Sequence, residues 1–182
     1  MNNHLSFAIK AAVAATALGA AMVAPAATKS VINTRVDAAL NTFYAQGSNH
    51  RQLANKAAAV LVFPRVTKAG VGVGGEYGEG ALEVNGATVG YYKVTGASVG
   101  ATLGAEHRSE VILFMTDAAR EKFMKSNGWT VGADTNLAVV KGVGGEADTE
   151  TLQHPVVAFV FGEKGLIADV SLEGEKVTKL HR

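Results

Sequence analysis

The chain has 182 residues, 17 basic and 16 acidic side chains, and no cysteine. This length supports one ordinary domain with a core that is stable without disulfides or metals. The lack of cysteine excludes a disulfide framework, a thiolate metal site, a cysteine nucleophile and the lipid-modified cysteine of a bacterial lipoprotein. Any metal site would therefore have to use His, Asp and Glu.

Residues 1–26 have the pattern of a secretory signal peptide. Lys10 precedes an alanine-rich apolar run that is too short to span a bilayer. The motif Ala24-Pro25-Ala26 offers small residues at the spacing that a signal peptidase accepts, so we expect cleavage after Ala26. Retention of the segment as a membrane anchor is the alternative. Cleavage would leave residues 27–182 as one domain in the periplasm or outside the cell.

Basic side chains are concentrated at the start of the mature chain. Residues 27–68 contain six basic residues and one acid, and the remainder is correspondingly acidic. Such a segment suits anionic lipid headgroups or an acidic partner. Solvated helix faces explain the same charges equally well. The candidate lipid-binding residues are Arg35, Arg51, Lys56, Arg65 and Lys68.

Two short helices are predicted before Pro64. Over residues 30–46 apolar side chains recur three and four residues apart, which is the stripe of an amphipathic helix, and Gly47 ends it. Ser48 or Asn49 can cap a second helix, which gives way to a strand-like run before Pro64. We expect the basic side chains of these helices to meet lipid headgroups while apolar residues of the same helix enter the membrane shallowly.

After Pro64 the composition predicts an antiparallel β region. Most of the 21 glycines lie here, among short runs rich in Val, Thr and Tyr. Asn85-Gly86 is the strongest hairpin signal, because both residues tolerate the positive φ angles of a type I′ turn. Glycines inside strands indicate bulges, tight bends or close approach of two backbones.

One more helix and further strands are predicted towards the C-terminus. Thr116 or Asp117 caps a helix that continues through Met124 and stops at Gly128. The strands are expected at residues 135–140, 155–161 and 166–172. The fold class is therefore α+β: a glycine-rich, strongly curved antiparallel sheet or open barrel, with the N-terminal helices and one inserted helix packed on it.

No catalytic or cofactor-binding pattern emerges. Gly70, Gly72 and Gly75 fit G-x-G-x-x-G, but the residues that follow are a poor start for the helix that a dinucleotide site needs. The histidines of the mature chain lack a metal-ligand spacing, which favours surface or turn positions. Neighbours in the run His107-Arg108-Ser109-Glu110 point to opposite faces of a strand, so they cannot form a triad among themselves. We expect no enzyme activity, no cofactor and no metal.

Two other groups have alternative interpretations. Glu76, Glu79 and Glu83 could gather carboxylates near one sheet edge, but solvated acids in a glycine-rich turn are favoured. Trp129 and the pair Tyr91-Tyr92 could anchor at a membrane interface. Core packing is favoured for Trp129.

The chain contains AVLVFP at residues 59–64 and KAGVGVGG at residues 68–75, followed by GEG. These motifs closely resemble the start of the SYLF domain, a lipid- and actin-binding family. The run GASVGATLGA at residues 96–105 looks like the family's glycine-spaced strand, and residues 110–116 look like its next apolar strand. Residues 165–174 resemble its closing strand. The segments stand in family order and cover nearly the whole mature chain.

The resemblance implies a non-enzymatic module that binds phospholipid membranes, with eukaryotic members also binding actin and bacterial members commonly exported as single domains. We expect residues 27–182 to be one SYLF-like domain that associates peripherally with an anionic phospholipid membrane through its basic helical segment. A protein–protein scaffold in the cell envelope, an actin-binding-like module, is the alternative. No nucleic-acid partner is expected.

Overall fold

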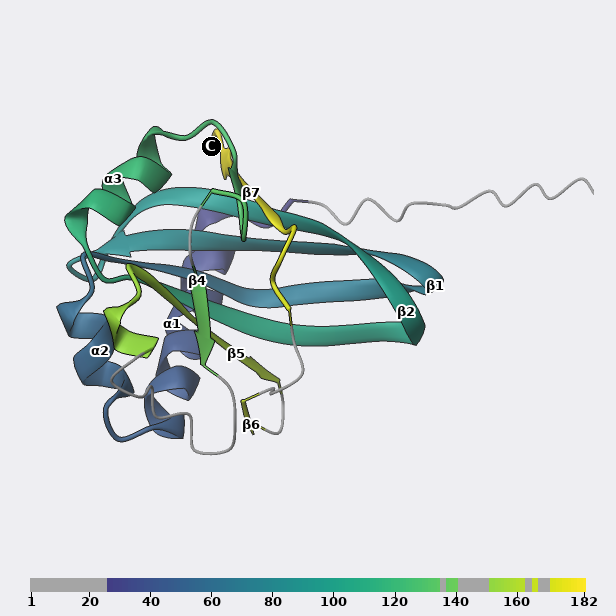
Figure 1. Ribbon diagram of the computed structural model, residues 1–182, viewed down its shortest axis with the longest axis horizontal. Coiled ribbons are helices and arrows are strands. Elements are labelled where there is room, and N and C mark those ends of the chain that lie inside the picture. Colours follow the sequence, from purple (N-terminus) through teal and green to yellow (C-terminus); the bar gives the residue numbers. More distant parts are fainter. Residues whose placement is uncertain (1–25, 135–136, 141–150, 163–164, 167–170) are drawn as a thin grey trace, which may run out of the picture.

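Three α-helices and seven strands form the part of the chain that the computed structural model describes, which is residues 26–134, 137–140, 151–162, 165–166 and 171–182 (Figure 1). The elements are α1 (Lys29–Gln46), α2 (His50–Lys56), β1 (Ala59–Val84), β2 (Ala87–Phe114), α3 (Asp117–Lys125), β3 (Trp129–Thr130), β4 (Leu137–Val140), the 3-10 turn η1 (Thr151–Gln153), β5 (Val156–Gly162), β6 (Gly165–Leu166) and β7 (Lys176–Leu180).

Some predicted features fall outside these residues. They include the signal peptide and most of the strand expected at residues 166–172. The boundaries proposed for the signal peptide and for a single mature domain stay predictions. Among the described helices, none is both long and apolar enough to cross a membrane.

The helix α1 forms as predicted and packs its apolar stripe on the sheet. The Thr28 hydroxyl caps it by accepting a hydrogen bond from the backbone N–H of Val31 at 3.3 Å. The residues of the stripe are all buried in the core: Ile32, Val36, Leu40 and Phe43. Shallow insertion of this stripe into a membrane is therefore wrong as an expectation, because the sheet already covers the residues that would insert.

The strands β1 and β2 form one long antiparallel hairpin, paired from Ala59 opposite Phe114 to Val84 opposite Ala87. Asn85 and Gly86 join them with φ angles of 52° and 74°. Both values are positive, as the type I′ turn requires, so the predicted hairpin is confirmed.

Both long strands bend, so that β1 crosses over itself (Figure 1). A Cβ atom at Gly80 would lie 1.9 Å from the carbonyl oxygen of Val62, and one at Gly78 would lie 2.9 Å from that of Arg65. Only glycine allows two backbones to approach this closely. The strong curvature predicted from the glycine content is thus confirmed. The G-x-G-x-x-G run lies inside strand β1, so no helix follows it.

The sheet has the strand order β3-β7-β2-β5-β4, with β1 also paired to β2 and β6 paired to β5. The predicted α+β class with a curved open sheet is confirmed. The pairing of β4 with β5 is parallel, however, and all other pairings are antiparallel. The strand β7, which pairs with the first half of β2, was not predicted.

Apolar residues are buried on both faces of the sheet. Val62 and Phe159 belong to a cluster beneath α1 and α2, whereas their neighbours Phe63 and Ala158 belong to a second cluster that includes residues of α3. Trp129 is 2% exposed in this second cluster, which confirms core packing. Because both faces are covered, β5 is a continuous apolar run without alternation.

Candidate functional site

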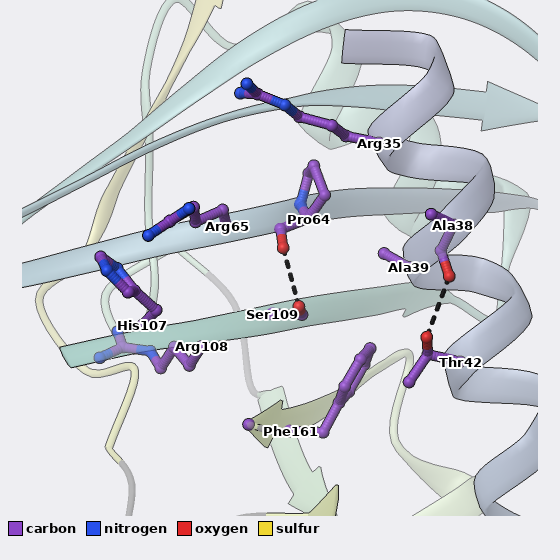
Figure 2. Close-up of a pocket in the computed structure, with 11 residues that line it drawn as sticks. Arg35, Ala38, Ala39, Thr42, Pro64, Arg65, His107, Arg108, Ser109 and Phe161 are labelled. Atoms are coloured by element: carbon purple, nitrogen blue, oxygen red, sulfur yellow. Dashed lines mark hydrogen bonds between the residues drawn. The ribbon is translucent and has the colours of Figure 1, made fainter. Parts of the chain in front are cut away.

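A pocket of about 440 Å³ lies between α1, β1, β2 and the end of β5 (Figure 2). Four basic side chains line it, and they come from three elements: Arg35 from α1, Arg65 from β1, and His107 and Arg108 from β2. The remaining lining includes the apolar side chains of Ala38, Ala39, Pro64 and Phe161. The structure therefore brings together two of the five candidate residues, Arg35 and Arg65, with a histidine that was not among them.

The two arginines are available to a ligand. Both side chains are exposed, and neither has a hydrogen-bond or ion-pair partner among the described residues. In Figure 2 their guanidinium groups extend to the same side of the pocket. A guanidinium offers several donors in a planar fork that matches the oxygens of phosphate or carboxylate. The pocket thus has the chemistry of an anion-binding site.

The hydroxyl groups around the pocket are bonded to the backbone. Ser109 Oγ donates to the carbonyl oxygen of Pro64 at 2.8 Å, and Thr42 Oγ1 donates to that of Ala38 at 3.0 Å (Figure 2). The Ser109 proton therefore points at a carbonyl rather than at a general base, which an activated serine requires. His107 Nδ1 lies 3.1 Å from the Thr67 hydroxyl, so Nε2 is the ring nitrogen left for a ligand.

The other three candidate residues do not line this pocket. Arg51 lies on α2, with its guanidinium carbon 4.2 Å from the centre of the Tyr44 ring, in a cation–π contact. Lys56 is exposed at the end of α2, and Lys68 is half-buried on β1, opposite Glu106 of β2. The structure thus divides the predicted set into a pocket pair and three separate cations.

A buried ionic cluster, which was not predicted from the sequence, is centred on the residue that follows His107 in β2. Arg108 borders the pocket and donates to Glu110 at 2.8 Å, to Glu76 at 2.6 Å and also to Glu175. Its side chain is 9% exposed, and that of Glu110 is fully buried. The sequence signal was an Arg and a Glu two residues apart, on one face of a strand that continues into a buried apolar run.

One guanidinium cannot neutralise three carboxylates in a buried site. Burial and the nearby charge of Glu110 raise the pKa of Glu175 to about 9. Burial also raises the pKa of Glu110, although Arg108 opposes that shift. Glu175 therefore holds a proton at neutral pH. Within the described residues, no three His, Asp or Glu side chains are arranged to hold a metal ion.

Two interpretations of titratable residues were wrong. Glu76 and Glu79 are not solvated acids, because Glu76 pairs with Arg108 and Glu79 pairs with Arg182 in largely buried positions. His50, expected at the surface or in a turn, is fully buried. Its ring stacks on Phe43 at 4.4 Å, and its Nδ1 lies 2.8 Å from the Phe43 carbonyl oxygen.

Comparison with known proteins agrees with the motifs. Residues 95–181 match the family described as Ysc84, Las17-binding protein actin regulator. Over 152 residues the chain is 30% identical to beta cell expansion factor A of Aeromonas veronii, an alignment that covers 80% of this chain and 54% of that protein. The chain thus spans about half the length of this curated relative. These two matches confirm the resemblance of the motifs to the SYLF, or Ysc84, family, whose model covers residues 95–181 of this chain.

Proposed function

We propose that this protein is a non-enzymatic phospholipid-binding protein and that its basic pocket holds the phosphate of an anionic headgroup. The observation that carries the proposal is the meeting of Arg35 and Arg65 in one pocket, with no partner for either among the described residues. The family is associated with actin and lipid binding, which supports a binding role in general.

The pocket suggests how a phospholipid would bind. The two guanidinium groups and His107 Nε2 donate to phosphate oxygens, while Ala38 and Phe161 offer apolar surface to the first carbons of the lipid. Because the apolar stripe of α1 is in the core, peripheral association depends on the pocket and on charge rather than on helix insertion. Arg51, Lys56 and Lys68 lie outside the pocket and add long-range attraction, which weakens with distance from the anionic surface.

The proposed location is the periplasm or the outside of the cell, in association with a membrane. The support is the signal-peptide pattern of residues 1–26. Fractionation of the native host, followed by N-terminal sequencing, tests it. Intact Met1 on protein from the cytoplasm would defeat the export half of the proposal.

Vesicle co-sedimentation tests the lipid half with a matched pair of double variants. Arg35→Gln/Arg65→Gln removes two charges from the pocket, and Arg51→Gln/Lys56→Gln removes two charges from α2. Two lost contacts of about 1 kcal/mol each correspond to roughly 30-fold weaker binding to phosphatidylglycerol vesicles for the pocket variant. The α2 variant should bind only a few-fold more weakly. Equal losses would indicate that diffuse surface charge, and not the pocket, is responsible for binding. A wild-type protein that does not bind the vesicles would refute the function.

A protein–protein scaffold is the second candidate, favoured by an apolar groove elsewhere. Val84, Val89 and Met124 line this groove between the hairpin and α3, and the last two are 45% and 42% exposed. The family description as an actin regulator suggests a filament as the partner. Co-sedimentation with actin filaments that is lost in Met124→Lys, with vesicle binding intact, would favour this candidate.

A further inference from the structure

Ala27 is held by a polar cluster that joins the start of the fold to its last residue. Its backbone N–H donates to Glu79 Oε2 at 3.1 Å, and its carbonyl oxygen accepts a hydrogen bond from Arg182 Nη1. Arg182 Nη2 also donates to Glu79 Oε1 at 2.5 Å. The side chains of Glu79 and Arg182 are only 11% and 16% exposed. A largely buried carboxylate is thus fixed beside the nitrogen of Ala27.

The two oxygens of Glu79 are unequally used. Oε1 accepts from Arg182 and from the Tyr77 hydroxyl, which lies 2.7 Å away. Burial and this hydrogen bond raise the pKa of Tyr77 to about 12, so the phenol remains a donor. Among the described residues, Oε2 accepts only from the amide of Ala27. Lys93, which is opposite Glu79 in the β1–β2 register, forms no ion pair with it in the described structure. Oε2 can therefore accept a stronger hydrogen bond than the one that the amide donates.

The nitrogen at this position is the one that signal-peptide cleavage would free. The motif Ala24-Pro25-Ala26 predicts cleavage after Ala26, which makes the nitrogen of Ala27 the new α-amino group. We propose that Glu79 is a socket for the α-ammonium group of Ala27 while Arg182 holds the carbonyl oxygen of Ala27 and the other oxygen of Glu79, so that cleavage at this peptide bond completes the fold. This inference rests on the expected export of the chain and does not depend on lipid binding.

The change of charge at Ala27 makes Glu79 a stronger partner after cleavage than before it. Hydrolysis of the Ala26–Ala27 bond leaves a carboxylate on the departing peptide and converts a neutral amide with one donor into a cation with three. Hydrogen bonds between ionised groups are roughly twice as strong as neutral ones. The new cation also precedes Thr28, the cap of α1, where the helix dipole is positive and disfavours a positive charge. Glu79 supplies the negative charge that offsets this repulsion.

Three chains that begin at successive residues test the proposal. Chains that begin at Ala26, Ala27 or Thr28 are released from a cleavable N-terminal fusion, and their melting temperatures are compared. We expect the Ala27 chain to melt about 2–4 °C above both others, because only its ammonium group reaches Glu79. Glu79→Gln should close this gap. Glu106→Gln removes an exposed acid elsewhere on the hairpin and should leave the gap unchanged.

A second measurement needs no side-chain variant, so it decides the matter even if Glu79→Gln does not fold. Reductive methylation followed by peptide mass spectrometry should modify the α-amine of the Ala27 chain at least five-fold more slowly than that of the Ala26 chain. Equal rates, equal melting temperatures, or a gap that survives in folded Glu79→Gln would overturn the socket. N-terminal sequencing of protein from the native host should read Ala27, and any other first residue would overturn the processing step.

Discussion

Neighbouring residues of β2 belong to two charged sites with opposite properties. His107 faces the basic pocket, where Arg35 and Arg65 are exposed and lack partners among the described residues. Arg108 is buried and is surrounded by three carboxylates. A charge that leaves water must be paired, so Arg108 is committed to the fold, whereas the exposed arginines can exchange water for a ligand. Burial, rather than residue type, separates the structural arginine from the candidate binding residues.

The strongest test of this comparison removes the buried charge. Arg108→Met removes the one positive charge among the buried acids Glu76, Glu110 and Glu175, and breaking a buried pair in this way destabilises a protein by about 3–5 kcal/mol. Urea unfolding followed by circular dichroism measures the change. Arg65→Gln is the matched control and should alter stability by no more than about 0.5 kcal/mol. An Arg108→Met variant as stable as the wild type would show that the cluster is not structural.

The buried cluster should also make stability depend on pH. Glu175 has a pKa of about 9 in the fold against 4.5 for an ordinary glutamate, so the folded state binds more protons between these values. The free energy of unfolding therefore falls as pH rises from about 4.5 to about 9, by at most about 1.4 kcal/mol per pH unit for one group. Urea titrations at pH 5, 7 and 9 measure the slope. Glu175→Gln should flatten it, and an unchanged slope would assign the effect to other groups.

Salt should weaken vesicle binding by the pocket, but it should hardly change the stability that depends on the buried cluster. Raising the ionic strength from 0.01 M to 0.15 M shortens the Debye length from about 30 Å to about 8 Å. Wild-type binding to phosphatidylglycerol vesicles should fall several-fold over this range, and Arg35→Gln/Arg65→Gln should lose much of that dependence. Thermal stability at pH 7 should change little, because the Arg108 cluster is shielded from solvent ions. Salt-insensitive binding would instead indicate insertion of an apolar group.

The smallest expected effect concerns an arginine that is neither buried like Arg108 nor, among the described residues, without a partner like Arg65. Arg51 is exposed but rests on the Tyr44 ring. Arg51→Gln should destabilise the fold by about 0.5–1 kcal/mol through the lost cation–π contact. Its effect on vesicle binding should be smaller than that of Arg65→Gln. Thermal unfolding and co-sedimentation of the two single variants check both expectations, and the reverse order of binding losses would contradict the pocket.

The sequence by itself determined the features that depend on residues close together in the chain. The stripe of α1, the Thr116 cap of α3 and the Asn85-Gly86 turn each rest on residues a few positions apart, and each forms as predicted. The glycines of β1 also predicted the bend, because a side chain at Gly80 would collide with the Val62 backbone.

Only the tertiary structure decided which distant side chains meet and which become buried. Arg108 and Glu175 are 67 residues apart in the chain, and no local pattern links them. The periodicity of α1 showed that one face would be buried, but it did not distinguish a sheet from a membrane as the apolar surface that covers it. Arg35 and Arg65 share a pocket because α1 packs across β1, and His50 is buried because Phe43 and Phe159 enclose its ring. These outcomes depend on how whole elements pack, since pairing and burial are set by neighbours in space rather than in sequence.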